Sequence, residues 1–356
     1  MPLLEPLNPY HTMTEFTSDS LTISISLFLV SALAIGISGT MMIAIAERLA
    51  KQTGLGEALM GALFLGLCTS LPGIVTSVTA AFGGYAELSI SNALGDIAAQ
   101  TAFLGIADIT YLEFNLEYAA ASAATLTQGT LLIVLLAIPL LTIANPAFTL
   151  WGIHPASIAL VATYIFGLRL VASAEKRPMW TPQQPEKLPI EKPDSADSEP
   201  DGLIGLWLRF LLLAGVLAIA GYGLEQTGVS IADSTNLSEN VVGSLFTALS
   251  TSLPELVTAL VAVRRGALTL AVSNVLGGNS FDILFLAFSD LAYRNGSIYQ
   301  ALTEHEIFIL ALTILITGIL VLGLLRREKH GIGNIGFESF LVLLLYVGGF
   351  LLVSFS

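Results

Sequence analysis

Charged side chains are scarce in this chain. Only 12% of its 356 residues are Asp, Glu, Lys or Arg, whereas 54% are hydrophobic, and the mean hydropathy is +0.80. Soluble globular domains carry about 25% charged residues, so this composition excludes an ordinary soluble protein. It indicates a polytopic protein of the lipid bilayer.

Cysteine and histidine are nearly absent as well. The single cysteine, Cys68, cannot form a disulfide within the chain, and the four histidines have no spacing typical of metal ligands. The 14 basic residues are outnumbered by 27 acidic ones, and the resulting net charge of −13 argues against a nucleic-acid partner.

Catalytic motifs are missing too. The sequence has no nucleophile-and-base set, phosphate-binding glycine loop or ATPase motif, so we expect neither an enzyme nor a cofactor, and any transport would be driven by an ion gradient. The first 19 residues are polar and acidic rather than basic. The first apolar stretch is therefore expected to stay in the membrane and not to be cleaved as a signal peptide.

Ten apolar stretches are long enough to cross about 30 Å of hydrocarbon. The expected spans are 21–46, 57–80, 87–110, 119–143, 148–174, 203–224, 239–263, 267–292, 303–325 and 336–355. Residues 175–202 are charged and rich in proline, so they are expected to form a flexible linker and not a domain. The sequence thus predicts an all-α membrane protein with a tail at 1–20 and five-helix halves at 21–174 and 203–356.

Basic residues orient these spans. If the N-terminus lies outside, 13 of the 14 basic residues fall on the cytoplasmic side or near the inner ends of spans, and only Arg294 is left outside. This asymmetry follows the positive-inside rule. It predicts that both termini lie on the non-cytoplasmic side and that the linker lies inside.

The chain contains an internal duplication. A shift of 182 residues lays 61–108 on 243–290 without a gap, so that TSLP and SNxLG recur in register, and it also lays Gly39 on Gly221. Because each half has an odd number of spans, the second copy would cross the membrane in the opposite sense. Inverted repeats of this kind are typical of secondary transporters with a site between the repeats.

Acidic side chains occur deep inside the apolar stretches. Glu255 and Asp282 would each cost at least about 2.5 kcal/mol at mid-bilayer, and such acids commonly serve ions or protons. In the first repeat Asn92, Asp96 and Gln100 follow one another at helical spacing on one stripe. Amides alone could simply hold helices together, but that interpretation is weak for the aspartates. Oxygen ligands without His or Cys suit a hard cation such as Ca²⁺ or Na⁺.

Prolines interrupt the second and seventh spans at matching places, Pro72 and Pro254. Each proline follows a threonine and a serine, which are Thr69, Ser70, Thr251 and Ser252. A proline kink repaired by hydroxyl groups would explain one such site. Its recurrence in both repeats favours a broken helix that coordinates a cation through backbone carbonyl and hydroxyl oxygens.

Four other acids are expected to have lesser roles. Asp108 and Asp290 match each other near span ends, so we expect them at the membrane interface, with a part in an ion path as the alternative. Glu57 and Glu239 begin spans, where a carboxylate favours the positive end of a helix.

These motifs resemble the two alpha repeats of the Ca²⁺/cation antiporter superfamily, which includes Na⁺/Ca²⁺ and H⁺/Ca²⁺ exchangers. The resemblance covers both halves and is most specific in the second, at 250–255 (STSLPE) and 277–282 (GGNSFD). It implies ten helices in two inverted five-helix repeats, with ions bound at the centre. Carried over residue by residue, it implies as ligands Glu255, Asp282, Thr251, Ser252, Thr69, Ser70 and Gln100.

The first repeat departs from the family pattern. Gly73 stands where the family has its first Glu, Asp96 where it usually has Ser, and Gln100 where it usually has Asn; in the second repeat Gly278 replaces the usual Ser. We expect Asp96 to restore the charge missing at position 73 and to act as a further ligand. The alternative is that Asp96 points to the cytoplasm or pairs with another polar group while the site has lost a charge.

The expected function is secondary active cation antiport by alternating access, with Ca²⁺ exchanged for Na⁺ or H⁺. Monovalent Na⁺/H⁺ antiport is the first alternative, because the missing Glu could leave too little charge for a divalent ion. An uncoupled channel or a sensor on the same scaffold is the second. The expected partners are inorganic cations and the lipid bilayer.

Overall fold

A computed structural model describes most of the chain. The described residues are 20–53, 69–111, 115–143, 149, 152–178, 202–235, 237–264, 266–329, 331 and 335–355. Within these ranges the chain is almost entirely helical and has no strand, which confirms the all-α class. The predicted tail, most of the predicted linker, and 54–68 with Glu57 and Cys68 lie outside the described residues.

The helices follow the expected spans. The first half contains α1 (Leu21–Thr53), α4 (Leu71–Gly83), α5 (Ala86–Thr110), α6 (Leu116–Ala120), α7 (Ala123–Ile143) and α8 (Pro155–Lys176). The second half contains α9 (Leu203–Thr235), α10 (Glu239–Val241), the π-helix η2 (Val242–Thr247), α11 (Ala248–Thr251), α12 (Leu253–Arg264), α13 (Leu268–Asp282), α14 (Leu284–Ala292), the 3₁₀ helix η3 (Ile298–Ala301), α15 (Glu304–Arg326) and α16 (Phe337–Phe355). In this part of the chain six helices are long and apolar enough to cross a membrane, or seven if one bent pair counts as a single span.

Several boundaries differ from expectation. Helix α1 continues to Thr53 rather than ending at 46, and α8 begins at Pro155 rather than at 148. Helix α9 continues to Thr235 rather than ending at 224, because its last turns bury Val229 and Ala232 against Leu88 of α5. The eighth expected span is divided at Ile283 into α13 and α14. Tertiary contacts set the last two features, and the hydropathy of the sequence does not record them.

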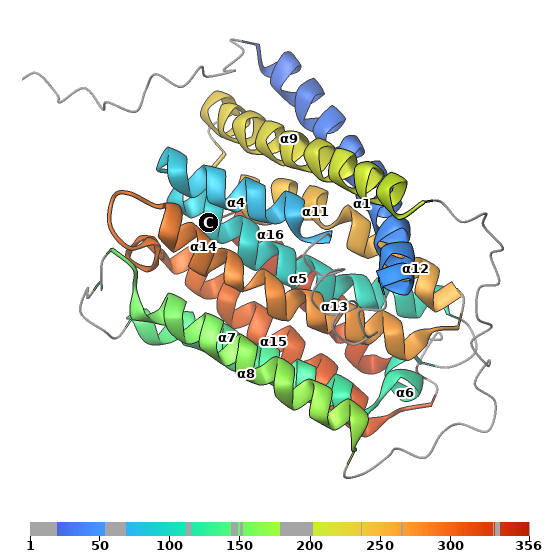
Figure 1. The fold of residues 1–356 in the computed structure, drawn as a ribbon. Helices are drawn as coiled ribbons and strands as arrows, with labels where there is room; N and C mark the ends of the chain where they lie inside the picture. The colour runs from blue at the N-terminus through green and yellow to red at the C-terminus, as the bar shows by residue number, and fades with distance from the viewer. Residues whose placement is uncertain are drawn as a thin grey trace, which may run out of the picture.

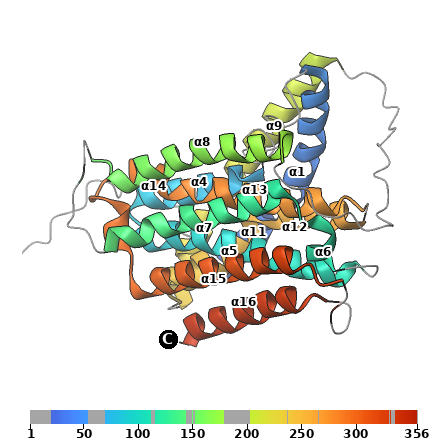
Figure 2. The same ribbon diagram turned by 90° about the horizontal axis from the view of Figure 1, so that it is seen from below.

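Helices α1 and α9 form a pair that stands apart from the other helices. They pack against each other, and Figure 2 shows that they run at a steep angle to the other long helices. The pair shares an apolar cluster of its own, in which Phe28 and Ile35 of α1 meet Leu213 and Leu217 of α9. The remaining long helices form the main bundle, with α5 and α13 between the α1–α9 pair and the α7–α8 pair (Figure 1).

Proline fixes the places where helices of the main bundle begin. Pro72 and Pro254 each occupy the second position of a helix, α4 and α12, where a missing N–H leaves no hydrogen bond unmade. The seventh span bends by 47° at Ser252, between α11 and α12. The predicted interruption of this span is therefore confirmed.

The same prolines mark where the α1–α9 pair touches the main bundle. A Cβ atom at Gly39 of α1 would lie 2.8 Å from Pro254 Cβ, and one at Gly221 of α9 would lie 2.9 Å from the carbonyl oxygen of Pro72. The two glycines are equivalent in the repeat, as are the two prolines. Each half therefore contributes a glycine that lets its long helix approach the proline-containing helix of the other half, α12 or α4.

This close approach predicts different outcomes for two glycines of α9. Gly221→Ala should lower the free energy of unfolding by about 1–3 kcal/mol, because the added methyl group meets the fixed carbonyl of Pro72. Gly215→Ala adds the same methyl group where no atom lies within 4 Å and should leave stability unchanged or raise it. Thermal unfolding of both variants in detergent micelles measures the difference. Equal effects of the two substitutions would contradict the packing described here.

Candidate cation site

Asp282 lies at the C-terminal end of α13, next to the residue that precedes α4. Its Oδ1 atom accepts a hydrogen bond from Ser70 Oγ at 2.5 Å, and its Oδ2 atom accepts one from Gln100 Nε2 at 2.7 Å. All three side chains are buried. Asp282 belongs to the second repeat, whereas both of its partners belong to the first.

Asp96 on α5 is held in a similar way, with the roles of the two repeats exchanged. Its Oδ1 atom accepts hydrogen bonds from Thr251 Oγ1 at 3.3 Å and from Ser252 Oγ, at the break between α11 and α12. Asp96 belongs to the first repeat and both hydroxyl groups to the second. Each buried aspartate is thus held by hydroxyl groups of the opposite repeat.

Glu255 lies in the first turn of α12, one turn after the break. Its side chain is half-buried, but its Oε2 atom is buried and accepts no hydrogen bond from the described residues. The carboxylate interacts with Thr69 and lies within electrostatic reach of Asp282. The structure therefore brings together all eight residues that the sequence and the family resemblance pointed to.

The position of Gly73 bears directly on Asp96. A Cβ atom at position 73 would lie 2.9 Å from Asp96 Oδ2 and 2.6 Å from Phe285 Cε2. The Asp96 carboxylate therefore occupies the space toward which a side chain at position 73 would project. Asp96 points into the site and not to the cytoplasm, and the polar groups with which it pairs are themselves candidate ligands.

Several acceptor oxygens around the site have no donor. Gln100 Oε1, Asn279 Oδ1 and Glu255 Oε2 are buried and accept no hydrogen bond in the described part of the chain. A buried acceptor without a partner is costly, so such atoms commonly face water or an ion. Among the described residues no three His, Cys, Asp or Glu side chains form a ready metal-binding group, so hydroxyl and amide oxygens would have to complete any coordination shell.

Asn92 behaves as its simpler interpretation predicts. Its Nδ2 atom donates to Ser77 Oγ at 3.0 Å, and its Oδ1 atom accepts from Thr247 Oγ1 at 2.7 Å. Both hydrogen-bonding groups of the amide are thereby used to join helices. Asn92 therefore has a structural role next to the site.

Two tyrosines near the site were missed by the sequence reasoning. Tyr164 of α8 lies within electrostatic reach of Asp282, and Tyr346 of α16 within reach of Asp96. Both hydroxyl oxygens are buried and have no partner among the described residues. Tyr346 is Tyr164 shifted by the repeat length, so extending the alignment of the two halves to their last spans would have paired them.

The remaining acids lie elsewhere. Asp108 and Asp290, expected at the membrane interface, lie near the ends of α5 and α14, and both are buried and accept hydrogen bonds from the backbone N–H groups of Leu116 and Ile298. Their depth in a membrane stays a prediction. Glu239 lies in the first turn of α10, as expected, and is 3.4 Å from the N–H of Leu88.

Sequence comparisons place these features in a known family. A profile of the family described as sodium/calcium exchanger protein matches residues 23–172 and 205–355, on either side of the predicted linker. A putative antiporter, CaxA of Alkalimonas amylolytica, is 26% identical over 299 residues, covering 83% of this chain and 89% of that protein. Inner membrane protein YrbG of Escherichia coli (strain K12) is 23% identical over 333 residues, covering 89% of this chain and 94% of that protein.

A solved structure of the sodium-calcium exchanger NCX_Mj has a similar fold. It is 20% identical in sequence and superposes with a TM-score of 0.59, covering 92% of this chain and 97% of that chain. At this level of identity the likeness concerns the fold.

Proposed function

The chain belongs to the sodium/calcium exchanger protein family, and on that basis we propose that it is a secondary active antiporter that exchanges Ca²⁺ for Na⁺ or H⁺. We further propose ten spans in two inverted five-helix repeats, with both termini on the non-cytoplasmic side. The proposed ligands are Glu255, Asp282, Asp96, Thr251, Ser252, Thr69, Ser70 and Gln100.

The observation that carries this proposal is the exchange of partners between the repeats. Asp96 is held by hydroxyl groups of the second repeat, and Asp282 by Ser70 of the first. A cation that neutralises both carboxylates would contact both repeats at once. Its binding energy would therefore depend on how the two repeats are placed relative to each other, which is the coupling that alternating access requires.

The ligand chemistry favours a hard cation. Ca²⁺ takes six to eight oxygen ligands from carboxylates, carbonyls and hydroxyl-bearing groups, and Na⁺ uses similar atoms. Asp96, Asp282 and Glu255 interact electrostatically with one another, and buried acids at such short range are stabilised by a counter-ion. A divalent ion would neutralise two of the three.

The α1–α9 pair is the element we propose to move. It has its own apolar cluster and touches α12 and α4 at their prolines through Gly39 and Gly221. Sliding of a rigid pair over α4 and α12 would open the site first to one side of the membrane and then to the other.

Proteoliposomes test the proposal. Uptake of radioactive calcium should require an opposing Na⁺ or H⁺ gradient, and the gradient that drives uptake identifies the coupling ion. Calcium flux without coupling would indicate a channel. Na⁺/H⁺ exchange without calcium uptake would favour the monovalent alternative, in which the site lacks charge because position 73 is glycine.

Neutralising Glu255 should stop exchange without unfolding the protein. Glu255→Gln should lower coupled calcium uptake at least about tenfold, because a charged ligand is lost. Glu304→Gln removes an exposed carboxylate from the first turn of α15 and serves as the matched control, with uptake unchanged. Thermal unfolding of both variants checks that they are folded. Uptake by Glu255→Gln at the unmodified rate would place the site elsewhere.

Exchanging positions 73 and 96 should reveal their interdependence. Asp96→Ser removes a carboxylate, and Gly73→Glu forces a second one against Asp96, so each single variant should lose calcium uptake. The double variant should recover part of it, because one acid again occupies that side of the site. The side chain introduced by Gly73→Glu must displace Phe285 whether residue 96 is Asp or Ser. The energetic cost of that displacement therefore cancels in the double-mutant cycle. Additive losses would contradict the idea that Asp96 replaces the missing Glu.

A further inference from the structure

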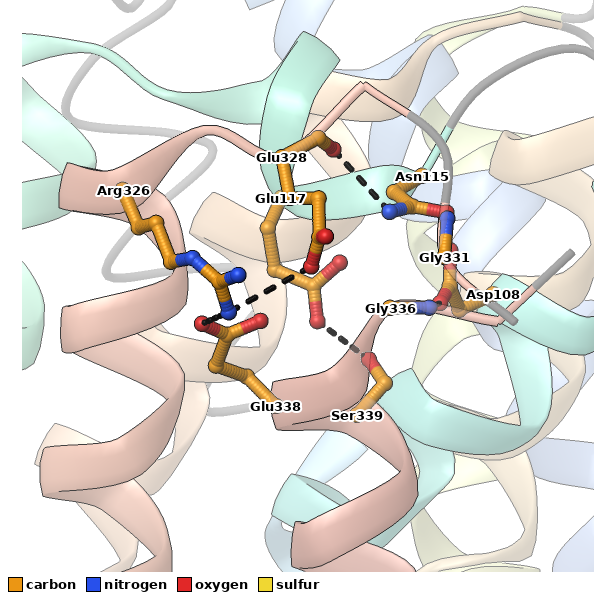
Figure 3. Close-up of polar contacts among 9 residues, drawn as sticks. All are labelled: Asp108, Asn115, Glu117, Arg326, Glu328, Gly331, Gly336, Glu338 and Ser339. Atoms are coloured by element: carbon orange, nitrogen blue, oxygen red, sulfur yellow. Dashed lines mark hydrogen bonds and ion pairs between the residues drawn. The ribbon is translucent and has the colours of Figure 1, made fainter.

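A buried aspartate ties the turn after α5 to the start of α16. Asp108 accepts hydrogen bonds from the N–H of Leu116 (Oδ1, 2.6 Å) and from the N–H of Gly336 (Oδ2, 2.8 Å). Leu116 begins α6 in the first half, and Gly336 precedes α16 in the second half. These three residues, here named the Asp108 clasp, join the two halves at one end of α5. Asp108 and Gly336 are labelled in Figure 3.

The same clasp occurs in the other half. Asp290 accepts hydrogen bonds from the N–H of Ile298 (Oδ1, 3.0 Å) and from the N–H of His154 (Oδ2, 2.7 Å). Each member is the repeat equivalent of a member of the Asp108 clasp, and even the carboxylate oxygens correspond. We name this set the Asp290 clasp.

One difference between the two clasps changes an ionisable group next to the carboxylate. In the Asp290 clasp Tyr299 follows Ile298, and its hydroxyl oxygen accepts a hydrogen bond from Ser157 Oγ at 3.1 Å. At the equivalent place in the Asp108 clasp stands Glu117, which accepts a hydrogen bond from Ser339 Oγ (Figure 3). A group that stays neutral is thus replaced by a carboxyl group.

Glu117 is deeply buried for a carboxyl group outside the membrane spans. Its side chain is 3% exposed, and its Oε2 atom has no hydrogen-bond partner among the described residues. That atom faces the backbone of the clasp, because a Cβ atom at Gly336 would lie 2.6 Å from it. If Glu117 were ionised here, its Oε2 atom would carry negative charge without contact to water or to a hydrogen-bond donor of the described residues.

The nearby cations are already engaged. Arg326 Nη1, at the end of α15, is 3.0 Å from Glu338 Oε1 and 3.3 Å from Glu328 Oε2 (Figure 3). Arg327 lies over the ring of Tyr118 and donates to its carbonyl oxygen. In the described part of the chain no basic side chain pairs with Glu117.

The groups that face Glu117 are mostly acidic. Asp108 approaches from α5 and Glu338 from α16, and α13, which also packs against α6, carries no charged side chain besides Asp282 of the candidate site. Burial, and secondly the charge of Asp108, raise the pKa of Glu117 from 4.5 to about 7, against the opposing effect of the Ser339 hydrogen bond.

We propose that Glu117 is a proton-binding site, separate from the cation site, whose protonation holds the Asp108 clasp closed. When Glu117 loses its proton, its carboxylate repels that of Asp108 and needs hydration by water. The start of α6 at Leu116 then moves away from Gly336. Helix α5 also carries Asp96 and Gln100, so this proton bears on the helix that forms the cation site. The Asp290 clasp has Tyr299 in place of this carboxyl group, so it lacks the response of Glu117.

The direction of the pH effect follows from linkage. Glu117 binds its proton more tightly in the closed clasp than in an open, hydrated one, where its pKa would return to 4.5. The closed clasp is therefore most stable below pH 4.5 and weakens as the pH rises toward about 7. Above that pH the closed clasp weakens no further, because Glu117 is then ionised in both the closed and the open clasp.

Hydrogen exchange of the full-length protein in detergent micelles tests this proposal. The amides of Leu116 and Gly336 report on the clasp, because both donate to Asp108. Their protection, corrected for intrinsic exchange rates, should fall about tenfold between pH 6 and pH 8, since only the interval from pH 6 to about 7 lies in the sensitive range. In the variant His154→Asn, which takes the histidine out of the Asp290 clasp and keeps a residue suited to an N-cap, protection of the Ile298 amide should not change and serves as the reference.

The variant Glu117→Gln supplies the matched control, because it keeps the shape of the side chain and cannot ionise. Leu116 and Gly336 should be equally protected at both pH values in this variant. The proposal is overturned if these amides in the unmodified protein follow Ile298, or if their pH dependence persists in Glu117→Gln. Should the variant fail to fold, the comparison with Ile298 decides alone. The experiment involves no transport, so its outcome is independent of which ions are exchanged.

Discussion

Water is absent from the hydrocarbon core, so every polar group buried there needs its partner within the protein. The two buried aspartates of the candidate site meet this demand through hydroxyl groups of the opposite repeat, Ser70 for Asp282 and Thr251 with Ser252 for Asp96. In this arrangement the hydroxyl groups that bind each aspartate all come from the other half. Burial of charge thus makes the two halves depend on each other.

The duplication repeats this dependence at three levels. In the site, acids pair with the other half's hydroxyl groups; beside it, Gly39 and Gly221 meet the other half's prolines; at the ends of the bundle, Asp108 and Asp290 bind the other half's backbone. The two copies differ in the acidic residues that they contribute to the candidate site. Gly73 corresponds to Glu255, so the first half supplies one acid to the site, from α5, and the second half supplies two, from α12 and α13.

The sequence alone predicts the helices and most of the candidate ligands, because hydropathy, proline and the repeat are local signals. It could not predict the π-helix η2, since its packing depends on a glycine of α5: a Cβ atom at Gly95 would lie 2.5 Å from the carbonyl oxygen of Ser244. Nor could it establish that Asp96 points toward Gly73, or that Glu117 lies beside Ser339, 222 residues away. These arrangements arise only when the halves pack together.

The central claim is that one cation site is built across both repeats by Asp96, Asp282 and Glu255. Anomalous X-ray diffraction from crystals of this protein soaked in Sr²⁺, a heavier divalent cation, tests it most directly, because the scattering locates the ion itself. The account predicts an anomalous peak enclosed by these three carboxylates. A peak bound by one repeat alone, or no peak between Asp96 and Asp282, would contradict it.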